Sequence, residues 1–548
     1  MNWDDLTDNQ RRVAIAQEQR ILVFGGAGSG KTTLALWCAR CFLQSTDAKN
    51  WQRAIFLTFS RTAVREIARR SGKALANVRD RVEIQTFHSF ANRVINAFGR
   101  YAGIGRTVPP FQSDAEARLL GRSKSHLGYD DLLPLALRII KQPRIKQLLS
   151  TRWPLVICDE FHDTDDLQWE ILCELSDGAR LVLLADLNQM IYDGFLGDRG
   201  VGPKRVEVAK KVADLIVDLG VPSHRDPSNV IPAMADAVRQ RRFNARAVQV
   251  AIKDNRLRVC NAVGDDDLVD VIKHEVEQAR HDGAQSIGIF GHSNQLVADL
   301  SADLFNAGLD HVLVGLPEAH GEALVVMETL CRHGLGKTDL HQVLLRLAVF
   351  LTAAVRGNAV PQLALALMGH TPIPGELSRR ITALSSAVVG AAKKGLDSLV
   401  QTATEAWPNL GIMSGRRPWA QAARTFGAIS HQIVARSGAR ENQFLIEISR
   451  RVAAQRTEAL IDLEVGLTHT TQVMNFHQTK GREADVVILV YRDADWFGRE
   501  TEPFTRNSRL FTSHLPGHVC GTLLFFLPIL IDWLHRSVGF FNDQQLTI

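Results

Sequence analysis

The chain alternates short apolar runs with longer segments in which apolar residues recur at helical spacing. Mostly apolar runs stand at residues 21–24, 55–59, 155–158 and 181–184, and glycine or polar residues follow each of them. A parallel strand needs a long crossover connection before the next one, and a helix usually supplies it. The pattern therefore predicts an α/β fold built on parallel strands.

The same alternation returns further along the chain, with a long interruption. Strand patterns occur at 286–290, 473–476 and 486–490, in a second α/β region that begins near Leu257. Residues 318–460 are rich in alanine and leucine at helical spacing and carry no catalytic pattern. We expect these domains: 1–225, first α/β domain with a small helical insertion at about 91–150; 226–317, first part of the second; 318–460, helical insertion; 461–548, last part with an atypical tail.

The first apolar run leads into a glycine-rich segment and then a helical pattern. A strand, a turn reading GGAGSGKT and a helix that opens on Lys-Thr form the phosphate-binding loop of an NTPase. Glycines let backbone N–H groups surround phosphate oxygens, and the helix N-terminus adds positive potential. The alternative is a glycine-rich turn without nucleotide. The expected nucleotide-binding residues here are Gly25, Gly26, Ala27, Gly28, Ser29, Gly30, Lys31, Thr32 and Thr33.

An acidic pair follows the third apolar run. Asp159 and Glu160 stand at the end of that strand, and Asp186 ends the next one. Polar residues at the carboxyl ends of parallel strands mark the usual ligand site of such sheets. We expect Asp159 and Thr32 to hold Mg²⁺, and Glu160 to orient the attacking water. Taken alone, an acidic pair is more often an exposed surface.

Composition narrows the class of protein only slightly. The chain has 548 residues, 45% of them hydrophobic, with a net charge of +5. That charge is too small to indicate nucleic acid by itself, although it allows local basic grooves. The seven cysteines are scattered and early aspartates argue against a signal peptide, so we expect a cytoplasmic protein. The apolar run at 519–531 is too short to cross a bilayer and predicts a buried strand.

Taken in order, the motifs resemble those of the UvrD/Rep-type superfamily 1 DNA helicases. The segments that carry this resemblance are Leu6–Gln10, Thr58–Ala63, Gln85–Phe90, DEFHDTDDLQ at 159–168, Ala185–Tyr192, Ser223–Arg225 and His477–Glu483. One departure stands within them, because His162 occupies a position where the family usually has glutamine. The resemblance implies two RecA-like parallel-sheet P-loop domains with helical insertions.

The resemblance also implies an activity and assigns roles. The activity would be ATP-dependent movement on single-stranded DNA, 3′ to 5′, in repair, recombination or defence, with ATP and Mg²⁺ as cofactors. Partners would be single-stranded DNA, DNA with single-stranded ends, and a separate nuclease subunit, with no membrane. Catalytic roles fall to Lys31, Glu160, Gln189 and Arg225, and further nucleotide contacts to Gln10, His224 and Glu483. DNA contacts fall to Phe59, Ser60, Arg61, His88, Tyr192, Phe195 and His477.

The last motif of the family is the place where the resemblance fails. The family has a Thr-Arg pair there, whose arginine completes the ATP site, whereas this chain reads NSRLFTSHLPGH at 507–518. Such an arginine is worth ~10³–10⁵ in rate in related NTPases. The alternative function is therefore a nucleotide-gated DNA-binding sensor with weak or no hydrolysis. An unrelated small-molecule kinase is disfavoured by the other motifs.

Overall fold

The computed structural model of the chain describes only part of the sequence. The described residues are 3–26, 28–45, 47–58, 64, 67–68, 75, 77–103, 111–123, 125–187, 200–220, 230, 233, 237, 242, 245–260, 265–291, 294–314, 317–355, 359–437, 440–461, 471–475, 484–490 and 523–526. The chain divides into two compact units. Residues 1–103, 133–314 and 467–548 form the first, and residues 104–132 and 315–466 form the second.

Within the described residues, six parallel strands form a first sheet, in the order β3-β2-β4-β5-β1-β6. They are β1 (Arg20–Phe24), β2 (Ala54–Thr58), β3 (Val82–Thr86), β4 (Leu155–Asp159), β5 (Arg180–Ala185) and β6 (Leu215–Asp218). Strands β2 and β4 are buried along their whole length, which explains their continuous apolar runs. The edge strand β6 alternates buried and exposed residues instead, and its short pattern gave no strand prediction.

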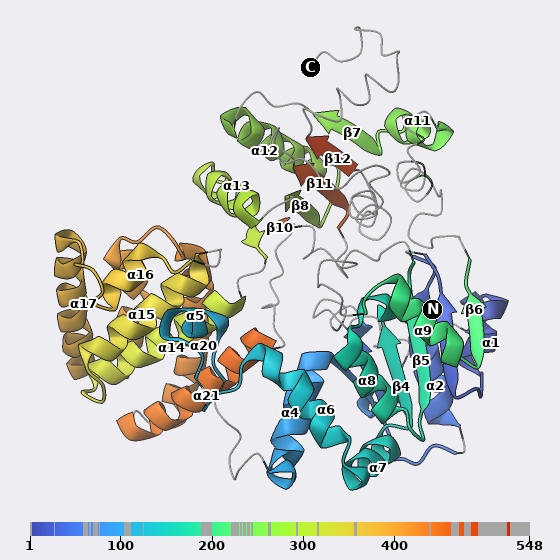
Figure 1. Cartoon of the computed structure of the whole chain (residues 1–548). Coiled ribbons are helices and arrows are strands. Elements are labelled where there is room, and N and C mark those ends of the chain that lie inside the picture. The colour runs from blue at the N-terminus through green and yellow to red at the C-terminus, as the bar shows by residue number, and fades with distance from the viewer. Residues whose placement is uncertain are drawn as a thin grey trace. The chain divides into compact units, whose positions relative to one another are not determined.

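Helices pack against this sheet and connect its strands (Figure 1). They are α1 (Asp8–Ala14), α2 (Lys31–Gln44), α4 (Phe87–Phe98), α6 (Leu132–Ile140), α7 (Pro143–Arg152), α8 (Asp166–Leu175) and α9 (Pro203–Val212). Helix α2 contributes Leu34 and Trp37 to a core that also contains Ile21, Phe56 and Ile157 from the strands. The helix that follows the glycine-rich loop is therefore anchored to the sheet along one face.

A second sheet also has six parallel strands, in the order β7-β12-β11-β8-β10-β9. They are β7 (Leu257–Cys260), β8 (Ile287–Gly291), β9 (Val312–Leu313), β10 (Thr471–Asn475), β11 (Val486–Val490) and β12 (Leu523–Phe526). Nearby helices are α11 (Arg246–Lys253), α12 (Asp265–His281) and α13 (Asn294–Asn306). The predicted α/β fold class with two parallel sheets is confirmed, as is a strand within the apolar tail.

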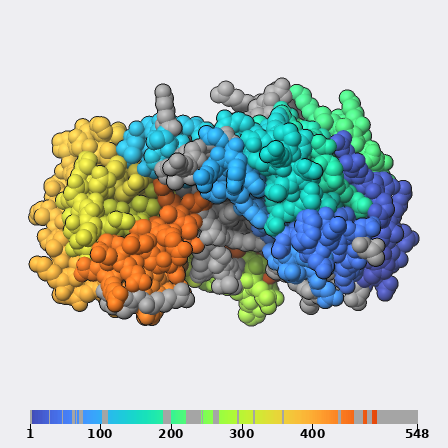
Figure 2. Space-filling model, turned by 90° about the horizontal axis from the view of Figure 1, so that it is seen from below, coloured from blue at the N-terminus to red at the C-terminus, as the bar shows by residue number. Residues whose placement is uncertain are grey.

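Between β9 and β10, the elements in the described part of the chain are helices. They are α14 (Pro317–Gly334), α15 (Leu340–Ala354), α16 (Gln362–Leu367), α17 (Gly375–Lys394), α18 (Leu396–Thr404), α19 (Ala406–Leu410), α20 (Arg416–Ser437) and α21 (Glu441–Ile461). In the space-filling view their yellow-to-orange residues form one continuous surface (Figure 2). Inside, Phe350 packs edge-on against Trp407 and Trp419, with ring centroids 4.5 and 5.4 Å away. Both indole N–H groups donate to backbone carbonyls, so the aromatic core leaves neither of them unpaired.

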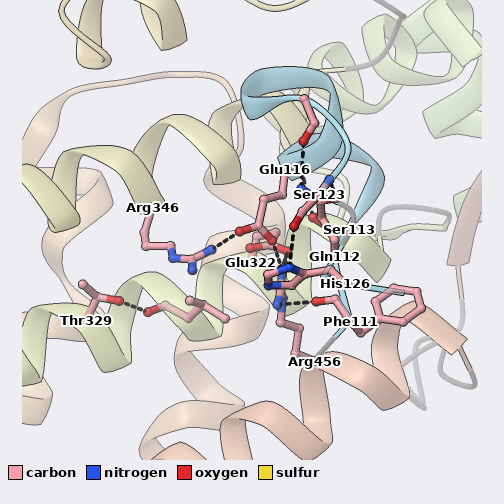
Figure 3. A network of polar contacts seen from close by, with 12 residues as sticks. Phe111, Gln112, Ser113, Glu116, Ser123, His126, Glu322, Thr329, Arg346 and Arg456 are labelled. Atoms are coloured by element: carbon pink, nitrogen blue, oxygen red, sulfur yellow. Dashed lines mark hydrogen bonds and ion pairs between the residues drawn. The ribbon is translucent and has the colours of Figure 1, made fainter. Parts of the chain in front are cut away.

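The second unit also includes a segment from much earlier in the chain. Helix α5 (Asp114–Leu120) packs on α15, and Glu116 pairs with Arg346 at 2.9 Å and with Arg456 at 2.8 Å (Figure 3). The backbone N–H of Ala115 donates to Glu318 at 2.6 Å. This division differs from the boundaries expected from the sequence, which placed all of 91–150 within the first domain. The ion pairs that hold α5 join residues more than 200 positions apart, and no local pattern announces them.

No helix in the described part of the chain is both long and apolar enough to span a membrane.

Candidate nucleotide-binding site

The glycine-rich loop joins β1 to α2 and closes tightly on itself. Gly28 and Gly30 have φ values of 79° and 86°, in the left-handed region that glycine adopts without steric cost. A Cβ added to Gly25 would collide with Oγ of Ser29, so a larger residue there would force the Ser29 side chain to move. The Ser29 hydroxyl is buried and has no hydrogen-bond partner among the described residues. A phosphate oxygen at the N-terminus of α2 would supply one.

Lys31 opens α2 and turns its ammonium group back over the loop. Its Nζ donates to the carbonyl oxygens of Gly25 at 2.7 Å and Gly26 at 3.0 Å. It also pairs with Oδ2 of Asp186 at 3.3 Å, and both side chains are nearly buried. Asp186 directly follows β5, so this ion pair joins the loop to the carboxyl end of the neighbouring strand. An ammonium held this way is placed to meet an anion bound in the loop.

Asp159 ends β4 and meets the next residue of α2. Thr32 Oγ1 donates to Oδ2 of Asp159 at 3.4 Å. Burial, followed by the negative charge of Glu160, raises the pKa of Asp159 from 3.8 to about 6, although Lys31 and Thr32 act in the opposite direction. A bound cation would stabilise the ionised form of this carboxylate. Carboxylate and hydroxyl oxygens are ligands that Mg²⁺ prefers, so these two residues fit a magnesium ion.

Glu160 follows Asp159 with an unusual backbone. Its φ of 55° lies in the left-handed region, a conformation that costs a non-glycine residue of order 1–3 kcal/mol. Residues with such strained backbones cluster at functional sites. Oε2 of Glu160 lies 3.3 Å from Nε2 of His162, a fully buried residue in the 3₁₀ turn η5 (Phe161–Asp163). The Nδ1 atom of the same ring accepts the backbone N–H of Asp186 at 3.1 Å. One imidazole thus touches the ends of both β4 and β5.

The segment after this turn is held by local capping. The Asp165 side chain accepts the backbone N–H of Gln168 at 2.8 Å, and Oε1 of Gln168 accepts the backbone N–H of Asp165 at 3.2 Å, which forms a capping box at the start of α8. Phe161 is buried against Trp169, with ring centroids 5.4 Å apart. Much of the sequence motif DEFHDTDDLQ is therefore explained by structural roles around Asp159 and Glu160.

Gln10 lies beside the loop and is 3% exposed. Its Oε1 accepts the backbone N–H of Thr7 at 2.9 Å, which completes the capping box of α1. Its Nε2 donates to the carbonyl oxygen of Ser29 at 3.0 Å. Both ends of the amide are engaged, so Gln10 links α1 to the phosphate loop. Reading of adenine by this residue stays a prediction.

Strand register explains why these groups meet. Phe24 lies beside Ala185 in the sheet, and Thr58 lies beside both Asp159 and Thr86. The loop residues, Asp159, Glu160 and Asp186 therefore follow strand ends that share one edge. Thr33 lies in the first turn of α2.

Of the expected DNA-contacting residues, His88 lies within the described part of the chain. It stands in the first turn of α4 and is half-buried, while the neighbouring Phe87 and Phe90 are buried in the core. The predicted residues that lie outside the described part are Ala27, Phe59, Ser60, Arg61, Gln189, Tyr192, Phe195, His224, Arg225, His477 and Glu483. Residues 507–518, where the final arginine motif would stand, also lie outside it.

Sequence reasoning left two members of this site without a role. Asp186 was recognised only as a strand end, yet it pairs with Lys31. His162 was noted only as a departure from a family pattern, yet its ring contacts two strand ends. The strand-end position of Asp186 was a usable signal. Nothing in the sequence reveals which atoms the His162 ring contacts.

Comparisons with known proteins follow the same motifs. Residues 9–195 match the family model of an AAA domain. DNA helicase II of Escherichia coli K12 is 23% identical over 248 residues, a match that covers 34% of this chain and 34% of that protein. The ATP-dependent DNA helicase PcrA of Leuconostoc citreum is 26% identical over 126 residues, or 23% of this chain and 17% of that protein. The chain is related to the UvrD/Rep-type superfamily 1 helicases.

A third relative matches a shorter region at higher identity. The RecBCD enzyme subunit RecB of Mycolicibacterium smegmatis is 41% identical over 83 residues, which cover 14% of this chain and 8% of that protein. These matches leave most of each relative's length uncovered. They confirm the resemblance to superfamily 1 helicases that the motif order predicts.

Proposed function

We propose that this chain is an ATP-driven motor that moves along single-stranded DNA, 3′ to 5′, and separates a duplex that lies ahead of it. One observation carries the proposal: Lys31 and Thr32, from the start of α2, meet Asp186 and Asp159 at the carboxyl ends of two parallel strands. The named activities of the helicase relatives support it. The cytoplasm is the proposed compartment.

The residues divide the work of ATP hydrolysis between them. Lys31 would exchange the carbonyls of Gly25 and Gly26 for the β- and γ-phosphate oxygens. Thr32 and Asp159 would hold Mg²⁺, and Glu160 would orient the attacking water. When bound, ATP supplies the phosphoanhydride bond that is cleaved, and Mg²⁺ neutralises charge on its phosphates. The family resemblance assigns the rest of the ATP site to Gln189, Arg225, His224 and Glu483. ATP binding and hydrolysis would then move the protein along the strand by alternating its contacts with the DNA bases.

Phosphate release by the full chain tests this function. We expect the rate to rise strongly when single-stranded DNA is added, and to vanish in Lys31→Ala. Release that DNA does not change would exclude translocation. Tight ATP-dependent DNA binding without release would instead identify a nucleotide-gated sensor, the function that the sequence at 507–518 favours.

The proposed partners are single-stranded DNA, DNA with single-stranded ends, and a separate nuclease subunit. The relatives named as the RecB part of a RecBCD enzyme and as part of an ATP-dependent helicase/nuclease support the last of these. A role in repair, recombination or defence would follow from such a complex.

A further inference from the structure

The ring of His162 lies between two groups whose chemistry fixes its protonation. Its Nδ1 lies 3.1 Å from the backbone nitrogen of Asp186. A backbone N–H can only donate, so Nδ1 must be the acceptor and carry no proton. In a neutral imidazole the single proton then resides on Nε2.

The protonated nitrogen faces carboxylates. Nε2 of His162 lies 3.3 Å from Oε2 of Glu160 and 3.8 Å from Oδ1 of Asp163. The protonated Nε2 therefore makes its nearest carboxylate contact with Oε2 of Glu160, although this contact does not have the geometry of a hydrogen bond. A doubly protonated ring would instead place an Nδ1–H group against the N–H of Asp186.

These contacts continue into the phosphate loop. The backbone N–H of Asp186 donates to Nδ1 of His162, and the carboxylate of Asp186 forms an ion pair with Lys31 at 3.3 Å. A connected series of contacts thus runs from Lys31 through Asp186 and His162 to Glu160. The ring is fully buried.

The main chain around His162 is held independently of its ring. The N–H of Gly202 donates to the carbonyl oxygen of His162 at 2.9 Å. The N–H of Asp163 donates to the carbonyl oxygen of Glu160 at 3.0 Å, and Arg205 donates to Thr164 at 3.2 Å. Replacing the ring should therefore leave the turn in place.

We propose that His162 is a positioning residue that holds the carboxylate of Glu160 and connects it to the strand end that contacts Lys31. The inference rests on the proposed function, because it assigns Glu160 to the attacking water. The position demands a side chain that accepts at one end and donates at the other. Histidine with its proton on Nε2 meets this demand, and so does the glutamine amide that stands here in the helicase family. Leucine fills similar space but offers neither group.

The test compares His162→Leu and His162→Gln in the full chain, with single-stranded DNA saturating. We expect His162→Leu to lower kcat by ~10–10²-fold, the cost of a small misplacement near a reacting group, while the KM for ATP stays within about twofold. His162→Gln should restore kcat to within a few-fold of wild type. An unchanged kcat in His162→Leu would overturn the proposal. So would an equal loss in both variants, or a loss confined to KM.

A second readout does not depend on turnover. In the full chain labelled with ¹⁵N-histidine, the His162 signals, identified by their absence in His162→Gln, should show a protonated Nε2 and an unprotonated Nδ1. The opposite tautomer would overturn the inference even in an active enzyme. If wild type releases no phosphate while the tautomer is as expected, the proposed function fails and the contact geometry stands.

Discussion

Two buried charged clusters in this chain are built in opposite ways. At the sheet edge, the pKa of Asp159 is raised to about 6, because burial and the charge of Glu160 outweigh Lys31 and Thr32. In the helical unit, burial would also raise the pKa of Glu116, but the charges and hydrogen bonds of Arg346 and Arg456 more than offset it, so the pKa is lowered from 4.5 (Figure 3).

The difference separates a cluster that awaits a cation from one that is already neutralised. Glu116 meets two guanidinium groups at 2.9 and 2.8 Å, so its charge is balanced within the protein. Asp159 has excess negative charge beside it, which suits a site that binds Mg²⁺ and a nucleotide. Breaking the Glu116 cluster should change stability, and breaking the Asp159 cluster should change turnover.

The largest effect is expected at Lys31. Lys31→Ala should lower DNA-stimulated phosphate release by ~10³-fold or more, because a cation on the transferred phosphoryl group is lost. The fold should survive, since the main contacts of Lys31 are with loop carbonyls. Phosphate release and thermal unfolding check both statements. Lys141→Ala, which removes an exposed pair with Glu170, is the matched control. Retained turnover in Lys31→Ala would show that the site is wrongly assigned.

Glu160→Gln should separate ATP binding from hydrolysis. Loss of the water-orienting carboxylate should lower turnover by ~10²–10³-fold, the usual contribution of a positioned base. ATP should stay bound, because the loop and Asp159 are untouched. Equilibrium binding of labelled ATP and single-turnover hydrolysis measure the two quantities. A variant that loses its affinity for ATP would contradict this role for Glu160.

On the structural side, Glu116→Gln should destabilise the helical unit by roughly 3 kcal/mol, because two partly buried arginines lose the carboxylate that they share. Chemical unfolding monitored by tryptophan fluorescence measures this, since Trp407 and Trp419 lie in the same unit. Glu376→Gln provides a matched control, because Glu376 also pairs with two arginines but is 58% exposed. That exposed cluster should contribute less than about 1 kcal/mol. Equal losses of unfolding free energy in Glu116→Gln and Glu376→Gln would contradict this difference between the buried and the exposed cluster.

His320 gives the helical unit a pH dependence. Burial lowers the pKa of His320 from 6.5 to about 4, and neither ring nitrogen has a hydrogen-bond partner among the described residues. The folded state favours the neutral ring, so this contribution to stability is fully present above pH 6.5 and is lost as pH falls toward about 4. At pH 5 the loss should reach about 2 kcal/mol.

The variant His320→Leu should remove this part of the pH dependence. Unfolding measured between pH 7 and pH 4.5 should show a smaller loss of stability in the variant than in wild type. His341→Leu, at an exposed position on α15, should follow wild type. Parallel curves for His320→Leu and wild type would refute the assignment.

The smallest effect is expected at Gln10, where two roles can be separated. Gln10→Ala removes the side-chain acceptor for Thr7 N–H in the capping box of α1 and the bond to Ser29, and should cost about 1 kcal/mol of stability. Gln10→Glu keeps an acceptor for Thr7 N–H but loses the donor to Ser29. It should weaken ATP binding and also lower stability, because a buried carboxylate oxygen would face the Ser29 carbonyl oxygen. Thermal unfolding and ATP affinity separate the two roles, and identical behaviour of the two variants would show that the distinction is wrong.

Local patterns in the sequence determined much of this protein. Apolar runs marked β1, β4, β5 and β11 because a strand buried on both faces must be apolar along its length. The loop at 25–32 could be recognised because its glycines, Lys31 and Thr32 each answer a local steric or electrostatic demand. Parallel strands then required that Asp159 and Asp186 share one edge.

Only the tertiary structure decided the contacts between distant residues. The pairing of Glu116 with Arg346 and Arg456 draws 104–132 into the helical unit, and no periodicity encodes a partner 230 residues away. The role of His162 depends on which atom faces each ring nitrogen, and that is set by the packing of β4 against β5. Periodicity reports which face of an element is buried, whereas the identity of the partner on that face is fixed only when the chain has folded.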